Sequence, residues 1–559
     1  MYIRLTRSKR SKNPTVQIVE SYRENGKVKQ RTIASLGVMR SEEDRERLTR
    51  VGNALIQKME SLRPQQSSFF PKPEKSIPKD TQRDAAKVDP KNLLHVRTRT
   101  CGFEEVFGKL AQEVGFKGIL STIDTMSRTS YSIQQIVMML ITQRLAEPTS
   151  KRRTLYLYQQ ENDTPICELH QVYRAMDALG PFDEPIQKAA YDATVRIFNR
   201  KIELYFYDIT TLYFESVKQD SIRDFGYSKD GKFNQVQILL GIAVDKDGIP
   251  VGYEIFSGKT AEIQTFEIAM RKMAIRFNNA PATIVCDRGM MKKANLAFIE
   301  SSKHFKYIIG EKLRTLAVQY HQEIQNKEKY QVHDELLLRE MPHPRIPNAR
   351  LILGFSQSRA KKDKHDRERL LDKLKVRLQR KGPKTLITNS GIKKYVTVIG
   401  GQVQLNEATI ERDAAWDGFF GITTNHPDLT PLDIASQYRG LWQVEATFRV
   451  AKHDLRTRPI YHWTEPRIRA HILICFMTLF LERTLYTKLK QNGSSLTTNQ
   501  IHDALKRCQR ITFYDPVTNR TFEMDSNKPA DAKLIFKTMT IPFRQPTQEI
   551  PNLAQVHLP

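Results

Sequence analysis

The stretch L-Y-F-Y-D-I-T-T-L-Y-F, residues 204–214, decides the fold. Its aromatic and β-branched residues are typical of a buried strand, and Asp208 stands in the middle of it. Two more apolar stretches follow: Q-V-Q-I-L-L-G-I-A-V-D, which ends at Asp245, and, after the turn D-K-D-G, I-P-V-G-Y-E-I-F-S-G. The three stretches predict consecutive antiparallel strands.

The pattern then alternates between helices and strands. Helical patterns at about 264–278 and 292–303 flank the short apolar strand A-T-I-V-C-D, and F-K-Y-I-I-G follows as a fifth strand. The order β-β-β-α-β-α-β predicts a mixed α/β sheet, because helical crossovers join parallel strands.

Residues 316–415 interrupt this pattern with short strand candidates and one charged helix, about 359–380. Between Arg359 and Lys384 there are twelve Lys/Arg and four acids. This run is either a solvated face or a contact with DNA phosphates, for which the candidates are Lys361, Lys362 and Lys364. Trp416, at the end of the interruption, either belongs to a core or stacks on an unpaired DNA base.

The core resumes with the strand F-F-G-I-T-T and a helix with clear start signals. Thr430 is its expected N-cap and Pro431 its first residue, and the helix is expected to run to about Asp454. One hydrophobic helix and an irregular tail are expected after it.

The chain before residue 201 predicts smaller units. Residues 1–37 predict a β hairpin turning at Asn25-Gly26; nine Lys/Arg against two Glu up to Arg31 fit either a protected edge hairpin or a contact with the DNA backbone. The expected domains are 1–62 (hairpin and helix), 63–92 (linker), 93–200 (helical, a candidate for DNA-end binding), 201–315 and 416–490 (the two parts of the core), 316–415 (insertion) and 491–559 (a candidate dimerisation region).

The net charge and the composition limit the classes of partner that the protein is expected to bind. The 559 residues contain 89 Lys+Arg and 62 Asp+Glu, a net charge of +27, which points to nucleic acid or an anionic surface. The longest apolar run has ten residues, too short to span a bilayer, so no membrane is expected. The five scattered cysteines include no C-x-x-C pair, which fits a reducing cytoplasm.

Three acids are placed where chemistry is expected: Asp208 within the first strand, Asp287 at the end of the fourth, and Glu445 on the late helix. Singly, each has a structural explanation: a turn contact, a helix cap, and a pair with Arg449. Together they supply the hard oxygen ligands that Mg²⁺ and Mn²⁺ prefer, and two such ions cleave phosphodiesters.

The late helix has a further pattern. Tyr438, Leu441, Glu445 and Lys452 follow helical spacing, with Arg449 adjacent, so a continuous helix places them near one stripe. Cations on such a stripe are suited to gripping phosphates beside a metal-binding acid. The alternative is an ordinary mixed-charge face.

These stretches carry a resemblance. The chain resembles DDE transposases of bacterial insertion sequences, of the type called family four, which carries a Y-x2-R-x3-E-x6-K motif. The resembling segments are Y-D-I-T-T-L-Y-F-E, F-G-Y-S-K-D-G-K, D-G-I-P-V-G-Y-E-I-F-S-G, V-C-D-R-G-M and Y-R-G-L-W-Q-V-E-A-T-F-R-V-A-K.

The resemblance implies a ribonuclease H-like mixed-sheet α/β core interrupted by a mostly β insertion, with N-terminal β hairpin and helical domains. It implies two Mg²⁺ ions, replaceable by Mn²⁺, on Asp208, Asp287 and Glu445. It also implies cleavage at element ends, joining to target DNA, and a homodimer on DNA. The motif's Arg position falls on Leu441, so Arg439 or Arg449 is expected to supply that charge. A catalytically inactive DNA-binding protein and a nuclease of the same fold are the alternatives.

Overall fold

A computed structural model describes residues 1–7, 13–24, 27–61, 90–162, 166–226, 234–290, 293–380, 394–399, 402–542 and 547–550. The chain folds into two compact units. One contains residues 1–109, 150–166 and 489–559, and the other contains residues 110–149 and 167–488.

A nine-stranded mixed sheet forms the centre of the second unit, in the order β10-β11-β12-β15-β9-β8-β5-β6-β7. Its strands β5, β8 and β9 are parallel to one another and the other pairs are antiparallel, which confirms the expected mixed α/β sheet. The core strands are β5 (Leu204–Tyr213), β6 (Gln237–Val244), β7 (Pro250–Ser257), β8 (Ala282–Cys286), β9 (Phe305–Glu311) and β15 (Phe419–Thr424).

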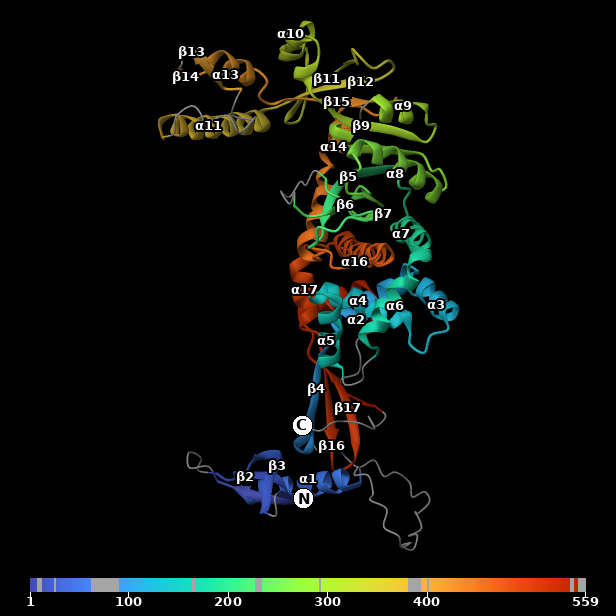
Figure 1. The fold of residues 1–559 in the computed structure, drawn as a ribbon, viewed down its shortest axis with the longest axis vertical. Helices are drawn as coiled ribbons and strands as arrows, with labels where there is room; N and C mark the ends of the chain where they lie inside the picture. The colour runs from blue at the N-terminus through green and yellow to red at the C-terminus, as the bar shows by residue number, and fades with distance from the viewer. Residues whose placement is uncertain are drawn as a thin grey trace. The chain divides into compact units, whose positions relative to one another are not determined.

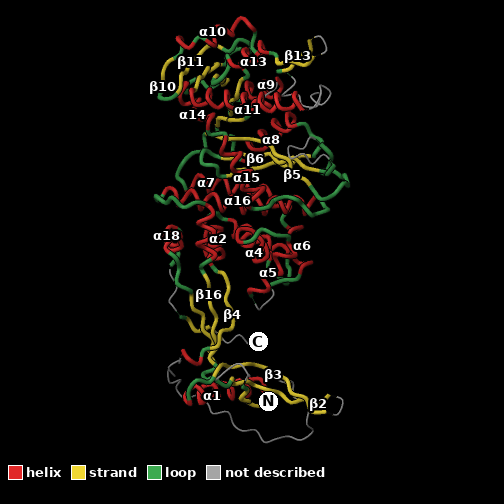
Figure 2. Tube along the Cα trace, turned by 90° about the vertical axis from the view of Figure 1, so that its left-hand side faces the viewer, coloured by secondary structure: helices red, strands yellow, loops and turns green. Residues whose placement is uncertain are grey.

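Helices cover both faces of this sheet. Helices α8 (Glu262–Arg276) and α9 (Lys293–Ser301) pack on one face, where Tyr207 and Ile284 join Phe266 in a buried core. On strands β5 to β7 the other face is covered by α15 (Trp442–Arg449) and α16 (Glu465–Gln491), so that α8 and α16 lie on opposite sides of the sheet in both views (Figures 1 and 2).

The insertion extends the core sheet. Its strands β10 (Gln331–His333), β11 (Leu336–Pro342) and β12 (Arg350–Ser356) continue the sheet beyond β15. The basic helix is present as α11 (Gln357–Arg380), followed by the hairpin β13 (Val396–Ile399) and β14 (Gln402–Leu405) and helix α13 (Glu407–Ala414). Lys384, the expected end of the basic run, lies outside the described residues.

The late helix is not continuous, contrary to the prediction. The expected N-cap is confirmed: Thr430 accepts a hydrogen bond from the Asp433 amide, and α14 (Pro431–Arg439) follows. The helix then breaks at Gly440, restarts as α15 and ends in a π-helical turn, Val450–Asp454. A Cβ on Gly440 would lie 2.3 Å from the Phe206 ring, so this close approach requires glycine, a poor helix former. The single helical stripe is therefore bent.

The remaining helices of the second unit come mainly from the region expected to be helical. They are α3 (Phe116–Ser127), α4 (Ile133–Ala146), α6 (Leu169–Ala178), α7 (Asp183–Ile197) and α10 (His321–Gln325). Helix α2 (Gly102–Glu113) has residues in both units.

The N-terminal region forms a three-stranded antiparallel sheet. The expected hairpin is present as β2 (Thr15–Glu24) and β3 (Lys27–Val38), and β1 (Tyr2–Thr6) adds a strand that the sequence pattern did not indicate. Helix α1 (Glu42–Ser61) matches the expected helix at 41–61. The Asn25-Gly26 turn and residues 62–89 of the predicted linker lie outside the described residues.

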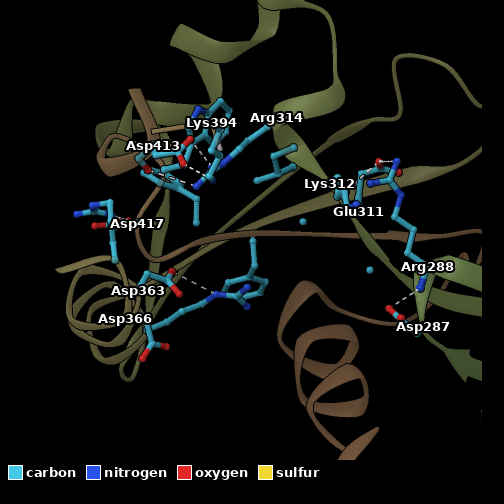
Figure 3. A pocket seen from close by; sticks show the side chains of 18 of the residues that line it. Asp287, Arg288, Glu311, Lys312, Arg314, Asp363, Asp366, Lys394, Asp413 and Asp417 are labelled. Carbon is cyan, nitrogen blue, oxygen red and sulfur yellow. Dashed lines mark hydrogen bonds and ion pairs between the residues drawn. The ribbon is translucent and has the colours of Figure 1, made fainter. Parts of the chain in front are cut away.

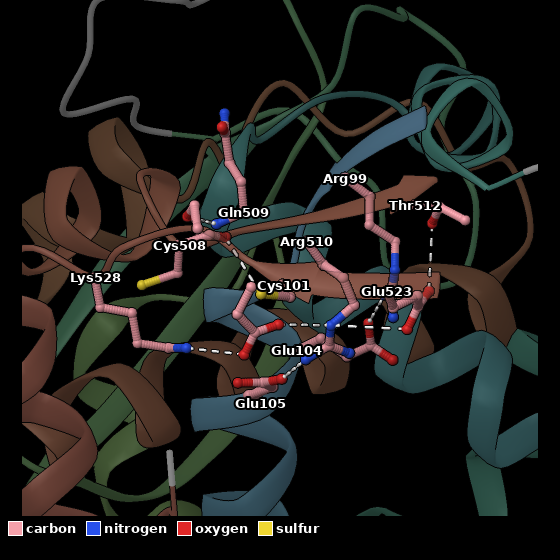
Figure 4. A network of polar contacts seen from close by, with 12 residues as sticks. Arg99, Cys101, Glu104, Glu105, Cys508, Gln509, Arg510, Thr512, Glu523 and Lys528 are labelled. Atoms are coloured by element: carbon pink, nitrogen blue, oxygen red, sulfur yellow. Dashed lines mark hydrogen bonds and ion pairs between the residues drawn. The ribbon is translucent and has the colours of Figure 1, made fainter. Parts of the chain in front are cut away.

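The C-terminal region is not an irregular tail, which corrects the prediction. After α17 (Thr498–Lys506), strands β16 (Gln509–Asp515), β17 (Arg520–Asp525) and β18 (Gln548–Ile550) form a four-stranded sheet with β4 (Leu94–Thr100); α5 (Lys151–Glu161) and α18 (Ala530–Thr538) are the other helices. The buried Arg510 ties this sheet to α2, because it binds Asp525 at 2.9 Å and Glu105 (Figure 4).

The cysteines and the long helices bear on the expectations about disulfides and membrane spans. All five cysteines are buried, free thiols. Among the described residues, no helix is both long and apolar enough to cross a membrane.

Candidate active site

Asp208 and Asp287 lie on neighbouring parallel strands at the same level. The pairing of β5 with β8 ends at Tyr207 opposite Cys286; Asp208 is the next residue of β5, and Asp287 directly follows the end of β8. Burial, and then the charges of Asp287 and Asp208, raise the pKa of the Cys286 thiol. The two carboxylates therefore share one neighbourhood at the end of β8.

Both aspartates face the helices that carry the late motif. Residues alternate between the faces of a strand, and Tyr207 belongs to the core under α8. On the opposite face Phe206 touches Gly440, and Thr210 lines a small cavity with Phe448 of α15. Asp208 stands between these two contacts, so it points towards α15.

Tyr438 packs over β9, which is the neighbour of the strand that Asp287 follows. Gly310 of β9 follows Ile309, which pairs with Cys286, so Gly310 is level with Asp287. A Cβ on Gly310 would lie 2.2 Å from the Tyr438 hydroxyl. Burial raises the pKa of Tyr438 to about 12, and the charges of Asp287 and Glu445 add to this. Tyr438 is therefore neutral near neutral pH and can donate a hydrogen bond from its hydroxyl.

The other residues of the late motif differ in exposure. Glu445 is exposed on the first turn of α15, and Arg439 and Arg449 are exposed at the ends of α14 and α15. Lys452 is half-buried in the π-helical turn and lines the small cavity with Thr210. The bend at Gly440 separates Arg439 from the residues after it.

A polar pocket of about 580 Å³ opens beside Asp287 and Tyr438 and extends to the insertion. Figure 3 shows Asp287 and Arg288 at one end and Lys394 with Asp413 at the other. Six basic and six acidic residues line it: Arg288, Lys312, Arg314, Arg359, Arg367 and Lys394, with Asp287, Glu311, Asp363, Asp366, Asp413 and Asp417.

Glu311 anchors the segment that follows Asp287. Its side chain is 7% exposed, with Arg288 at 3.5 Å and His343 at 3.4 Å. Burial alone pushes the pKa of Glu311 up, but His343, Arg288 and Arg345 outweigh it and hold the pKa below the usual 4.5. Glu311 thus stays charged and restrains Arg288 beside Asp287.

The insertion residues predicted to bind DNA differ in exposure: the lysines are exposed and the tryptophan is buried. Lys361, Lys362 and Lys364 are exposed on α11, and Lys364 pairs with Glu368 at 3.9 Å. Trp416 is 7% exposed and packs edge-on against His321, with ring centroids 4.9 Å apart, in the core of the insertion.

Sequence reasoning did not assign most of the charged residues of the pocket to the site, among them Arg288, Lys312 and Arg359. Arg288 follows Asp287 directly and Arg359 begins the basic run, so both stood next to features already singled out. Lys312 had no such signal, because only the pairing of β9 with β8 places it near Asp287.

The donor set fits a divalent metal in its chemistry, since carboxylate oxygens are the ligands that Mg²⁺ and Mn²⁺ prefer. In the part of the chain that the structure describes, no three His, Cys, Asp or Glu side chains form a metal-binding group. Asp208 and Asp287 are neighbours, and Glu445 lies on the helix facing them.

Comparison with solved structures found a chain in the "Cryo-EM structure of piggyBac transposase synaptic complex with hairpin DNA", with 8% identity, a TM-score of 0.36 and coverage of 74% of this chain and 82% of that one. No curated protein matches. The narrower family-four assignment stays a prediction.

Two family models match segments of this chain. Residues 3–66 match the IS1634 family transposase, N-terminal domain, and residues 199–481, half of the chain, match the Transposase DDE domain. The mixed-sheet α/β core and the DDE transposase domain expected from the resemblance are confirmed. The chain therefore belongs to the DDE transposases of insertion sequences.

Proposed function

We propose that this transposase binds the ends of its insertion sequence, cleaves the DNA there and joins the freed 3′-hydroxyls to target DNA. Asp208, Asp287 and Glu445 are its catalytic carboxylates. The observation that carries the proposal is that Asp208 and Asp287 stand at one level of two neighbouring parallel strands, with Asp208 on the face that α15 covers. Carboxylates that share one site repel each other unless a cation or a proton lies between them.

The three carboxylates would hold two divalent ions, Mg²⁺ or Mn²⁺, which supply charge stabilisation for the attacking and leaving oxygens. The protein's own groups orient the DNA. The Tyr438 hydroxyl donates a hydrogen bond to the DNA, and the side chains of Arg439, Arg449 and Lys452 contact phosphates. The enzyme acts on DNA in the bacterial cytoplasm, at the nucleoid, as a homodimer, because two element ends must be joined.

The test is incubation with labelled DNA that carries the terminal inverted repeats flanking the gene, together with Mg²⁺. The proposal expects a free 3′-hydroxyl at the element end and joined product. Binding without cleavage would indicate an inactive DNA-binding protein, and cleavage without joining would indicate a nuclease.

A further inference from the structure

Most cations of the catalytic pocket are already paired with acids. Arg314 and Lys394 both bind Asp413, at 2.7 and 2.5 Å. Arg367 binds Asp417, and Arg288 is held by Glu311. The other two cations of the pocket are Lys312, with which no described acid forms an ion pair, and Arg359, whose ion pair with Asp363 is 3.7 Å long.

Arg359 reaches the pocket from the first turn of α11, directly after β12. Its guanidinium lies over the Phe420 ring at 5.7 Å, and Phe420 itself packs on Gly354 of β12. Its Nε forms an ion pair with Asp363 of the same helix at 3.7 Å, and the Arg359 side chain is 53% exposed. The guanidinium is oriented by an aromatic ring, and its exposed part is available to a ligand.

Lys312 reaches the same pocket from the end of β9. It directly follows the last residue of the strand and lines the pocket together with Gly310, Tyr438 and Asp287. Its side chain is exposed, and no described acid forms an ion pair with it. The lysine thus adds a second positive charge to the pocket.

The turn between α14 and α15 lacks a cation at the position where the related motif has arginine, because Leu441 stands there. Arg439 is exposed at the end of α14 and does not line this pocket. Among the described residues of the pocket, Lys312 and Arg359 are the cations with the weakest contacts to acids.

We propose that Lys312 and Arg359 form a phosphate-binding pair that holds the DNA backbone next to the cleaved bond. This rests on the proposed function, because it needs DNA in the pocket beside Asp287. An arginine fork binds phosphate through two parallel N–H donors, and lysine adds a point charge. The first turn of α11 is then part of the active site.

The experiment measures single-turnover cleavage of pre-bound element-end DNA with Mg²⁺. Arg359→Gln and Lys312→Gln should each slow cleavage about ten- to a hundredfold, the range for losing a charge-assisted contact, and Arg359→Lys should recover part of the loss. Arg271→Gln is the matched control: Arg271 is 62% exposed and lies on α8, across the sheet, so its rate should not change.

A second arm replaces single phosphates flanking the cleaved bond with neutral methylphosphonates. At one position the replacement should slow the wild type and have no further effect on Arg359→Gln, because the contact is already lost. Independent, multiplying losses at every position would overturn the proposal, and so would wild-type rates in both variants.

The same assay separates this inference from the proposed function. If Asp287→Asn abolishes cleavage while Arg359→Gln and Lys312→Gln cleave normally, only the phosphate pair is wrong. If Asp287→Asn cleaves like the wild type, the proposed catalytic role itself is wrong.

Discussion

Gly310 determines where the Tyr438 ring can lie. Because an added Cβ would come within 2.2 Å of the hydroxyl and 3.0 Å of the ring, Gly310→Ala must displace Tyr438 from its place beside Asp287. We expect DNA cleavage to slow by about a hundredfold, the cost of misplacing a catalytic group by about 1 Å. Single-turnover assays measure this.

The control is the double variant Gly310→Ala/Tyr438→Phe, which removes the clashing oxygen. If the hydroxyl itself matters, this variant stays slow although the clash with the oxygen is gone. A Gly310→Ala protein that cleaves at the wild-type rate would contradict the placement of Tyr438 in the site.

Trp416 is expected to contribute to the stability of the insertion. Its ring is buried with Phe419 and His321, so Trp416→Ala should lower the free energy of unfolding by about 3–5 kcal/mol. Trp442→Ala removes a tryptophan that is 58% exposed and should cost much less. Urea unfolding compares the two. A stable Trp416→Ala protein with slow end processing would favour stacking on DNA instead.

Helix α11 provides a test at the level of one element. Lys361, Lys362 and Lys364 are exposed on it, outside the lining of the pocket. If each contacts one phosphate, replacing all three with Gln should reduce the slope of log K against log salt by about 2.7, at about 0.9 per phosphate. Binding isotherms over a range of salt concentrations measure the slope. An unchanged slope would assign the lysines to a solvated face.

Strand β9 carries a pH-dependent contact in Glu311. Since the pKa of Glu311 is below 4.5 in the folded protein, its contribution to stability is present above that value and is lost as pH falls through the folded pKa. The melting-temperature difference between wild type and Glu311→Gln should therefore shrink as pH falls from about 5 to 3. Glu335→Gln, at an exposed position, is the control. A constant difference would contradict the ion-pair role.

Across the whole molecule, local patterns were predictable and distant pairings were not. Strand β5, helix α8 and the Thr430 cap follow from propensity and capping within a few residues. The pairing of β4 with β16 joins segments more than 400 residues apart, and no local signal specifies it. For the same reason, β10–β12 were expected in an insertion but not as an extension of the core sheet.

Some residues of the candidate site could likewise be predicted from local sequence, and others could not. The two aspartates were found because each stands on a recognisable strand, and the family motif supplied Glu445. Lys312 and Arg359 come together only through the order of strands β12, β15 and β9, which the sequence pattern does not contain. The break at Gly440 depends on Phe206, more than 200 residues earlier.

The most direct measurement compares Asp208→Asn, Asp287→Asn and Glu445→Gln with wild type in end cleavage with Mg²⁺ or Mn²⁺. Asp334→Asn serves as the control, because Asp334 is exposed and its φ of 49° suits asparagine. The account predicts that all three site variants fold and bind DNA but give no free 3′-hydroxyl and no joined product, while Asp334→Asn behaves as wild type. Wild-type cleavage by any folded site variant would contradict the assignment of that carboxylate.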